Sequence, residues 1–146
     1  MFTHFLIPTD GSLVASKAVK AGITLAIKLG AKVTAYYAVE EPQPIYAEGY
    51  VMDQKTIDRV EEHARKVGQK YVDAIGKMAK AAGVPFVSVV TKSYTAYDGI
   101  IKAAIKHKCD VIFMASHGRR GLSKLIMGSV TQKVLAHAKI PVVVYR

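Results

Sequence analysis

Apolar residues are arranged along the chain in two alternating patterns. Short continuous runs are typical of strands buried in a sheet, and they occupy residues 4–9, 32–39, 84–90, 110–116 and 141–146. Between these runs, apolar residues recur every three or four positions, as on one face of a helix, over residues 12–30, 57–82, 97–105 and 129–139. The pattern therefore predicts strands and helices in strict alternation, beginning and ending with a strand.

Local signals mark the ends of several of these elements. Ser12 precedes the first helical segment and Gly30 follows it, as expected of an N-terminal and a C-terminal cap. Thr95 and Asp98 have the spacing of a capping box at the start of the third helix. Residues 40–53 contain two prolines and a glycine, which predicts a long irregular connection of the kind that often carries function.

Strands that alternate with helices are joined by right-handed crossovers, so we expect an α/β fold with a parallel sheet covered on both faces. Tyr36 and Tyr37 are neighbours on one strand, point to opposite faces and are expected in the core. Ligands of such folds bind at the carboxyl ends of the strands, where the strand order reverses. Three polar segments would meet there: PTDGS (8–12), VEEP (39–42) and ASHGRRGLSKLIMGSV (115–130).

Length and composition indicate one ordinary globular domain. The 146 residues are 51% hydrophobic and 22% charged, so we expect a single domain over residues 1–146 with its own core. No apolar run approaches the roughly 20 residues that cross a bilayer, and the first residues lack the features of a signal peptide. A single cysteine, Cys109, excludes an internal disulfide and is expected in the core. These features predict a cytoplasmic protein without a membrane segment.

The net charge of the chain is unusually positive. Lysine and arginine number 21 against 11 aspartates and glutamates, which gives a formal net charge of +10. A basic protein favours anionic partners, and nucleic acid is one alternative. However, the cations are scattered over helical segments 17–28, 55–80 and 102–108, and no motif that reads nucleic acid is present. Steep salt-dependent binding to any duplex would distinguish a nucleic-acid binder from a nucleotide sensor, which should prefer adenine nucleotides at moderate salt.

Gly118 and Gly128 enclose a basic loop that leads into a helix. Glycines let a backbone approach a ligand closely, and the first turn of a helix offers unpaired N–H groups at the positive end of its dipole. Arg119, Arg120 and Lys124 add positive potential. An anionic group, phosphate above all, is therefore the expected ligand.

Alternatives that need no ligand exist for the same residues. Ser129 and Gln132 have the spacing of a capping box, in which both side chains serve the helix itself. Asp10 could cap the first helix or brace the turn before it. His117 could be a loop histidine satisfied by its neighbours.

The loop resembles the nucleotide-binding motif of the universal stress protein family. Nucleotide-binding members carry G-2x-G-9x-G-[ST] after the fourth strand, and residues 115–118, nine further residues and then Gly128-Ser129 follow that layout. Only the first glycine differs, because Ala115 takes its place. The resemblance covers almost the full chain, from IPTDGS near the N-terminus to PVVVYR at the end.

This resemblance implies a three-layer, Rossmann-like fold with strand order 3-2-1-4-5, and a nucleotide-dependent regulator of the stress response that acts through protein partners. The ligand would be ATP, with Mg²⁺. Adenine would lie against Val39, Asp10 would lie near the adenosine and its metal, and the methyl group of Ala115 would lie close to the ribose. The implied nucleotide-binding residues are Pro8, Thr9, Asp10, Val39, Met114, Ala115, His117, Gly118, Gly128, Ser129, Val130 and Thr131.

The last strand has no later element to cover it, so we expect it at an edge of the sheet. An edge strand leaves N–H and C=O groups unpaired and is prone to association. Residues 141–145 could therefore pair with a second copy, and the resemblance implies the same homodimer.

An enzymatic function has less support in the sequence. The signatures of phosphate-loop NTPases, dinucleotide-binding enzymes, zinc proteases and serine hydrolases are all absent. No nucleophile can be paired with a base. A weak ATPase or self-phosphorylating enzyme remains the alternative, and it would use Ser129 or Thr131 beside the γ-phosphate.

Overall fold

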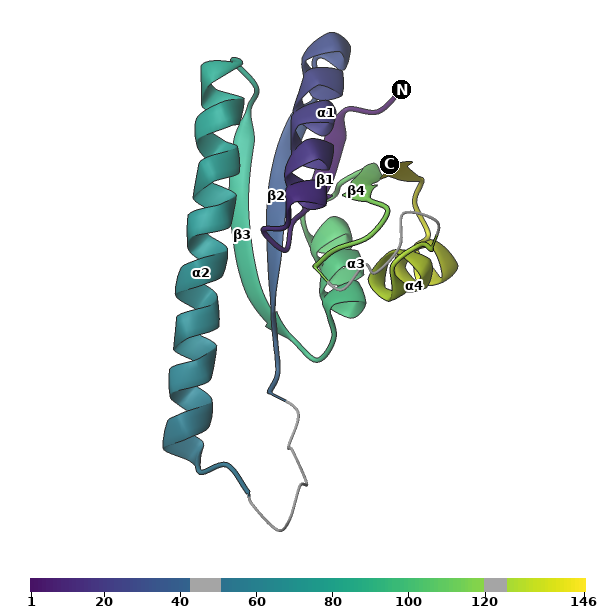
Figure 1. Cartoon of the computed structure of the whole chain (residues 1–146). Coiled ribbons are helices and arrows are strands. Elements are labelled where there is room, and N and C mark those ends of the chain that lie inside the picture. The colour runs from purple at the N-terminus through teal and green to yellow at the C-terminus, as the bar shows by residue number, and fades with distance from the viewer. Residues whose placement is uncertain (43–50, 120–125) are drawn as a thin grey trace.

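The structure, a computed structural model, describes residues 1–42, 51–119 and 126–146. Its strands are β1 (His4–Pro8), β2 (Lys32–Glu40), β3 (Phe86–Ser93), β4 (Val111–Ala115) and β5 (Val142–Tyr145). Its helices are α1 (Leu13–Leu29), α2 (Gln54–Ala81), α3 (Ala96–Lys106) and α4 (Ser129–His137). The described strands pair in parallel in the order β3-β2-β1-β4-β5, which confirms the predicted α/β class and strand order (Figure 1).

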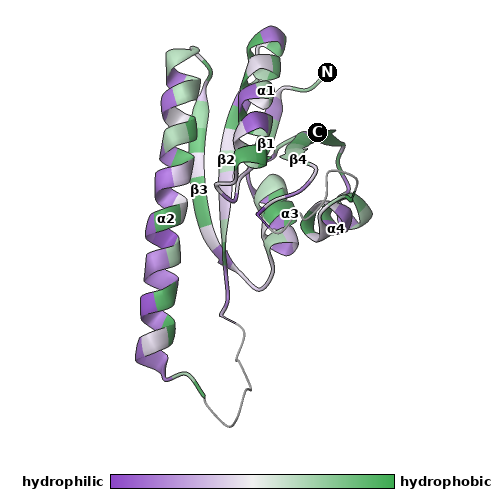
Figure 2. Ribbon diagram, in the orientation of Figure 1, coloured by the Kyte–Doolittle hydropathy of each residue, from purple (hydrophilic) through white to green (hydrophobic). Residues whose placement is uncertain are grey.

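Helices cover both faces of the sheet because alternate residues of each strand point in opposite directions. Phe5 and Ile7 of β1 belong to a core cluster with α1 and α2, whereas Leu6 belongs to a second cluster with α3 and α4. The sheet is coloured mostly as hydrophobic and the lower half of α2 mostly as hydrophilic (Figure 2). Within the described ranges, no helix combines the length and the apolar composition needed to cross a bilayer.

Caps fix the ends of α1 and α2. Oγ of Ser12 accepts the N–H of Ala15 at 3.1 Å, and Gly30 ends α1 in the left-handed region at φ 63°. Asp53 caps α2 by accepting the N–H of Thr56 at 2.8 Å. These contacts satisfy N–H groups that the first turn of a helix otherwise leaves unpaired.

Two expectations around β3 and α3 are wrong in detail. β3 begins later than predicted, because the N–H of Val84 bonds to the carbonyl of Ala79 at 2.9 Å and completes the end of α2. Thr95 is the N-cap of α3, but its side chain makes no capping hydrogen bond. Asp98 instead forms an ion pair with Lys102 at 2.7 Å, so the predicted capping box does not form.

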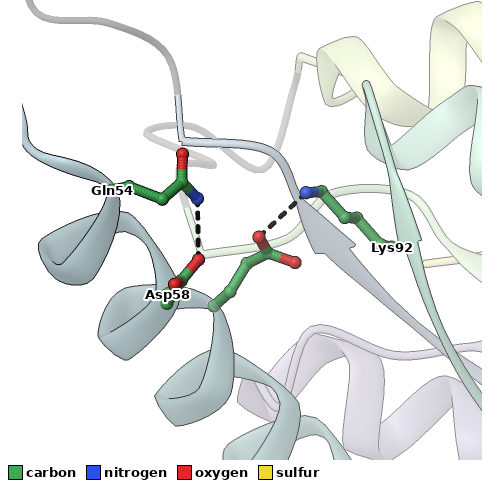
Figure 3. Close-up of polar contacts among 4 residues, drawn as sticks. Gln54, Asp58 and Lys92 are labelled. Atoms are coloured by element: carbon green, nitrogen blue, oxygen red, sulfur yellow. Dashed lines mark hydrogen bonds and ion pairs between the residues drawn. The ribbon is translucent and has the colours of Figure 1, made fainter.

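The N-terminal half of α2 is joined to the end of β3 by an ion pair. Nζ of Lys92 lies 2.8 Å from Oε2 of Glu61, and this hydrogen bond raises the pKa of Lys92. Figure 3 shows Lys92 reaching towards α2, beside the contact in which the amide of Gln54 donates to Asp58 at 2.7 Å. Exposed pairs contribute little to stability, so the contact orients α2 more than it holds the fold together.

The residues assigned to the core from the sequence lie there. Tyr36 is fully buried, and its hydroxyl shares a hydrogen bond with Oγ1 of Thr91 at 2.9 Å. Tyr37 packs against the cluster on the opposite face. Cys109 is buried, and burial raises the pKa of its thiol to about 11. A thiol of that pKa is protonated at neutral pH and is a poor nucleophile.

Asp110 ties the start of β1 to the start of β4. Its Oδ2 accepts the N–H and the hydroxyl of Thr3 at 2.8 and 2.7 Å, and its Oδ1 accepts the N–H of His4 at 3.0 Å. Burial raises the pKa of Asp110, but these hydrogen bonds outweigh burial and hold the pKa below its ordinary value. Charge-assisted hydrogen bonds of this kind are stronger than neutral ones.

His4 is a buried histidine in the same region. Its side chain is 5% exposed, its Nε2 lies 2.8 Å from Oγ1 of Thr34, and its Nδ1 has no hydrogen-bond partner among the described residues. Burial and, after it, the cation of Lys32 lower the pKa of His4, while the backbone of Lys108 and the carboxylate of Asp110 oppose them. The folded protein therefore favours neutral His4.

Acidification should weaken the fold through His4. The unfolded chain binds a proton near the ordinary pKa of 6.5, whereas the folded chain binds it only at lower pH, so stability is lost as the pH falls below 6.5. Urea unfolding at about pH 8 and about pH 5.5 should show a larger loss for wild type than for His4→Gln. His63→Gln, at an exposed position of α2, is the control and should keep the wild-type dependence. An equal loss in wild type and His4→Gln would contradict this account.

Candidate functional site

β1 and β4 are neighbours at the centre of the sheet, and the chain leaves them in opposite directions. After β1 it passes through α1 to β2, and after β4 it passes through α4 to β5. The helices of these two connections cover different faces. Ligands of open α/β sheets bind at such a reversal point.

Asp10 connects the two loops that meet at this point. Its Oδ1 accepts the N–H of Ser12 at 2.9 Å, within the turn between β1 and α1. Its Oδ2 accepts the N–H of Arg119 at 2.8 Å, from the loop that follows β4. Thr9 supports the same turn, because its Oγ1 accepts the N–H of Gly11 at 3.1 Å. Asp10 therefore braces its own turn and also holds the second loop.

Two glycines of the loop lie where a larger residue would come too close to a neighbouring residue. A Cβ on Gly118 would collide with Oδ2 of Asp10, so only glycine lets the loop come this close to the carboxylate. A Cβ on Gly128 would lie 3.1 Å from Cα of His117, which is also a tight approach. Neither glycine has a positive φ, so the reason for both is proximity and not an unusual backbone conformation.

The start of α4 contradicts the capping-box alternative. Gly128 is the N-cap, no side chain of the described residues caps this helix, and the amide of Gln132 donates to the carbonyl of Met127 at 2.6 Å. The N–H of Gly128 bonds to the carbonyl of Ser116 at 2.8 Å, which holds α4 next to the end of β4. Ser129 lies inside the first turn, where its hydroxyl does not cap the helix.

The first turn of α4 presents free donors. Among the described residues, none accepts a hydrogen bond from the N–H groups of residues 129–131. The hydroxyl of Thr131 is buried and donates to the carbonyl of Ala115 at 3.0 Å, whereas Ser129 is exposed. Free N–H groups at the positive end of a helix dipole attract an anion. Of the two hydroxyls considered for a reactive role, Thr131 is thus committed to the fold.

The other predicted residues lie around the same ends of the strands. His117 is half-buried, and its Nδ1 lies 3.0 Å from Oγ of Ser116. This contact agrees with the alternative in which His117 is a loop histidine satisfied by its neighbours. Pro8, Val39 and Met114 are buried near the carboxyl ends of β1, β2 and β4. Hydrogen bonds or close contacts join Asp10 and the residues after β4 to the start of α4, but among the described residues no hydrogen bond joins Val39 to this group.

Tyr71 was missed by the sequence patterns, which place it only on the apolar face of the long helix. Its hydroxyl accepts a hydrogen bond from Nη2 of Arg119 at 2.5 Å, and the guanidinium carbon lies 5.5 Å from the centre of its ring. These partners are far apart in the sequence, and no motif relates them. Arg120 and Lys124, which the sequence added to the positive potential of the loop, lie outside the described residues.

A separate groove of about 340 Å³ lies between β3 and α3. Lys92, Lys102, Asp98 and Glu41 are among the residues that line it, and none of the predicted nucleotide-binding residues does so. In the parts of the chain that the structure covers, no cluster of three or more His, Cys, Asp or Glu side chains is arranged to hold a metal ion. The groove therefore does not extend the candidate site.

Comparison with known proteins decides the family. The profile of the Universal stress protein family matches residues 1–146. The chain belongs to the universal stress protein family. A universal stress protein of Methanocaldococcus jannaschii is 31% identical over all of this chain and 83% of its own length, and one of Thermus aquaticus is 31% identical over the full length of both.

Solved structures share the fold of this universal stress protein. The Methanocaldococcus jannaschii protein MJ0577 superposes with a TM-score of 0.85 at 22% identity, over 99% of this chain and 95% of the other. A universal stress protein family member from Arabidopsis thaliana, solved with AMP bound, superposes with a TM-score of 0.65 at 16% identity, over 97% and 90%. A universal stress protein solved in complex with cAMP superposes with a TM-score of 0.73 at 20% identity, over 99% and 97%.

Ala115 stands where the motif of nucleotide-binding members has its first glycine. Its side chain is 8% exposed and belongs to the core cluster that contains α1 and α2. Met114, its neighbour, belongs to the cluster on the face of α4. The methyl group of Ala115 therefore points into the core on the face opposite α4, and its expected place close to the ribose stays a prediction.

Ala115→Gly should therefore reduce stability without improving ligand binding. The change removes a buried methyl group and adds backbone freedom within a strand, so we expect a loss of about 1–2 kcal/mol in the free energy of unfolding. Urea unfolding measures this loss, and calorimetry with adenine nucleotides should give affinities within about twofold of wild type. Unchanged stability together with a tenfold gain in affinity would instead place the methyl group in the site.

Proposed function

We propose that this universal stress protein binds an adenine nucleotide, ATP with Mg²⁺, at the carboxyl ends of β1 and β4. The observation that carries the proposal is the first turn of α4, whose N–H groups at residues 129–131 have no acceptor in the described structure. Gly118 and Gly128 hold the adjoining loop close to Asp10 and His117. Phosphate satisfies such donors and is favoured by the helix dipole.

Two relatives support the class of ligand. The neighbours solved with AMP and with cAMP share the fold, and both ligands contain adenine, ribose and phosphate. In this chain the phosphates would be held by His117, Gly118 and residues 128–131. Pro8, Thr9, Val39, Met114 and the backbone of Ala115 would surround the adenosine.

The carboxylate of Asp10 is only partly suited to a metal ion. Each of its oxygens already accepts one N–H, from Ser12 and from Arg119, so each has one lone pair left. Mg²⁺ keeps several waters and is commonly bound through one carboxylate together with substrate phosphates. The phosphates would therefore supply most of the ligands of Mg²⁺ other than water. Asp10 would supply one further ligand, or accept a hydrogen bond from a metal-bound water.

We infer a regulator that acts through protein partners and depends on its nucleotide state. The hydroxyl of Thr131 donates to the carbonyl of Ala115, and buried Ser116 has its hydroxyl 3.0 Å from Nδ1 of His117. Of Ser129 and Thr131, exposed Ser129 is the one whose hydroxyl is free for slow hydrolysis or self-phosphorylation. Mass spectrometry of nucleotide released from purified protein identifies the physiological ligand.

Gly128→Asp should abolish nucleotide binding without unfolding the protein. A carboxylate at this N-cap accepts the free N–H groups in place of phosphate and repels the anion. Calorimetry with ATP and Mg²⁺ should show a loss of at least about 30-fold in affinity, while thermal unfolding stays cooperative. Equal affinities for wild type and variant would refute the assignment of the site.

Two matched variants separate charge from size. Gly128→Asn adds the same bulk near His117 but no charge, so it should retain more affinity than Gly128→Asp. Ala136→Asp adds the same charge at an exposed position late in α4 and should bind nucleotide as wild type does. If Ala136→Asp lost as much affinity for nucleotide as Gly128→Asp, the loss would be due to the change in net charge and not to the position of the carboxylate.

We also propose a homodimer formed through β5. This strand lies at one edge of the sheet, and all four of its residues are half-buried in the single chain. The carbonyl of Pro141 accepts the N–H of Ile112 in β4 at 3.0 Å, and the carbonyl of Tyr145 accepts the N–H of Ser116, just after β4, at 2.9 Å. Because hydrogen-bonding groups alternate in direction along a strand, Val143 also faces β4, whereas Val142 and Val144 face the open edge.

Val144→Pro should therefore convert the dimer to a folded monomer. The change removes an N–H that faces outward, which an edge strand tolerates. Light scattering should give about twice 15.9 kDa for wild type and about 15.9 kDa for the variant. Val143→Pro is the contrasting variant, because it removes a donor to β4 and should destabilise the fold itself. A wild-type mass of one chain at micromolar concentration would refute the proposed dimer.

A further inference from the structure

Tyr71 of α2 lies where three parts of the candidate site meet. Its ring fills the space beside Gly11, where any Cβ would collide with ring carbons of Tyr71, and Gly11 has a positive φ of 78° in the turn after β1. Its ring centre lies 5.9 Å from that of Tyr37 on β2. Arg119, after β4, donates to its hydroxyl at 2.5 Å. Tyr71 thus contacts the segments that follow β1 and β4, and a residue of β2, the strand that pairs with β1 on the side away from β4.

Arg119 is held at two points. Its backbone N–H donates to Oδ2 of Asp10 at 2.8 Å, and its guanidinium lies over the ring and against the hydroxyl of Tyr71. The first contact fixes the path of the backbone next to Gly118, and the second holds the side chain on α2. Two anchors on different elements restrict a residue far more than either does alone.

We propose that Tyr71 and Arg119 form a clasp that positions the loop after β4 for nucleotide binding. The inference rests on the proposed function. Tyr71 lies outside the family motif quoted above, and Arg119 occupies one of the positions that the motif leaves unspecified. Both are positioning residues: they act through Asp10 and through Gly118, one of the residues proposed to hold phosphate. By fixing the start of the loop before a ligand arrives, the clasp reduces the ordering that nucleotide binding would otherwise require.

The ring and the hydroxyl of Tyr71 make different contacts, so a substitution can remove the clasp and keep the packing. The ring packs against Gly11 and Tyr37, and these contacts remain in Tyr71→Phe. Only the hydroxyl accepts the hydrogen bond from Arg119. Tyr71→Phe is therefore expected to fold as wild type does and to lose one of the two anchors.

Amide hydrogen exchange of Arg119 tests the clasp without any nucleotide. In wild type this N–H is protected by its bond to Asp10. Tyr71→Phe should raise its exchange rate at least about threefold, while the thermal midpoint stays within about 2 °C of wild type. Tyr94→Phe removes a phenolic hydroxyl from a side chain that is 64% exposed, and this control should leave the exchange of Arg119 unchanged.

Calorimetry with ATP and Mg²⁺ tests the effect on binding. Tyr71→Phe should weaken affinity about threefold to tenfold, and Arg119→Gln should weaken it at least as much. The double variant should bind no worse than Arg119→Gln alone, because both changes break the same contact. A merely structural role of Tyr71 would lower the thermal midpoint and give additive losses.

Three outcomes would overturn the inference. Unchanged exchange of the Arg119 amide in Tyr71→Phe would show that the side-chain contact does not order the loop. Faster exchange with unchanged affinity would show that this order does not serve binding. If wild type bound no adenine nucleotide, the proposed function would fail and the binding role of the clasp with it, while the exchange measurement would still decide whether the clasp exists.

Discussion

The candidate site depends on how β1 and β4 are held together. Their parallel ladder is short, with Phe5 opposite Val111 and Leu6 opposite Ile112. An aspartate extends the connection at each end: Asp110 binds the backbone before β1, and Asp10 binds the backbone after β4. The two strands at the centre of the sheet are therefore joined by backbone hydrogen bonds in the middle and by carboxylates at both ends.

This arrangement explains why the free donors of α4 lie where they do. The chain leaves β4 towards one face of the sheet and β1 towards the other, so no helix crosses the carboxyl ends of this pair. The N–H of Gly128 and the hydroxyl of Thr131 both bond to carbonyls at the end of β4, which fixes α4 beside it. Toward the described residues, the first turn of α4 keeps its donors unpaired because the helix is fixed by its N-cap and by the buried side chain of Thr131, and not by a capping box.

The fold could be predicted from the sequence because its determinants are local. Periodicity, Gly30 as a cap and the alternation of short and long apolar segments each depend on residues close in the chain. The contacts of the site are not local: Asp10 and Arg119 are 109 residues apart, and Tyr71 and Arg119 are 48 apart. The glycine pattern located the loop, but it did not show that Gly118 also lies against the carboxylate of Asp10.

The same distinction explains where spacing alone was misleading. Ser129 and Gln132, like Thr95 and Asp98, have the spacing of a capping box, yet neither pair forms one, because Gln132 bonds to Met127 and Asp98 to Lys102. A capping side chain competes with every other partner within reach, and the sequence does not show those partners.

A carboxylate beside a phosphate site needs a physical explanation, because like charges repel. Each oxygen of Asp10 accepts one backbone N–H, so one lone pair of each oxygen is directed into the protein. The chain as a whole carries a formal charge of +10, so the wider potential still attracts an anion. The first turn of α4 adds free N–H groups that Asp10 does not reach, since the described bonds of this carboxylate go to Ser12 and Arg119. Asp10 can therefore order the two loops while the donors of α4 remain available for phosphate.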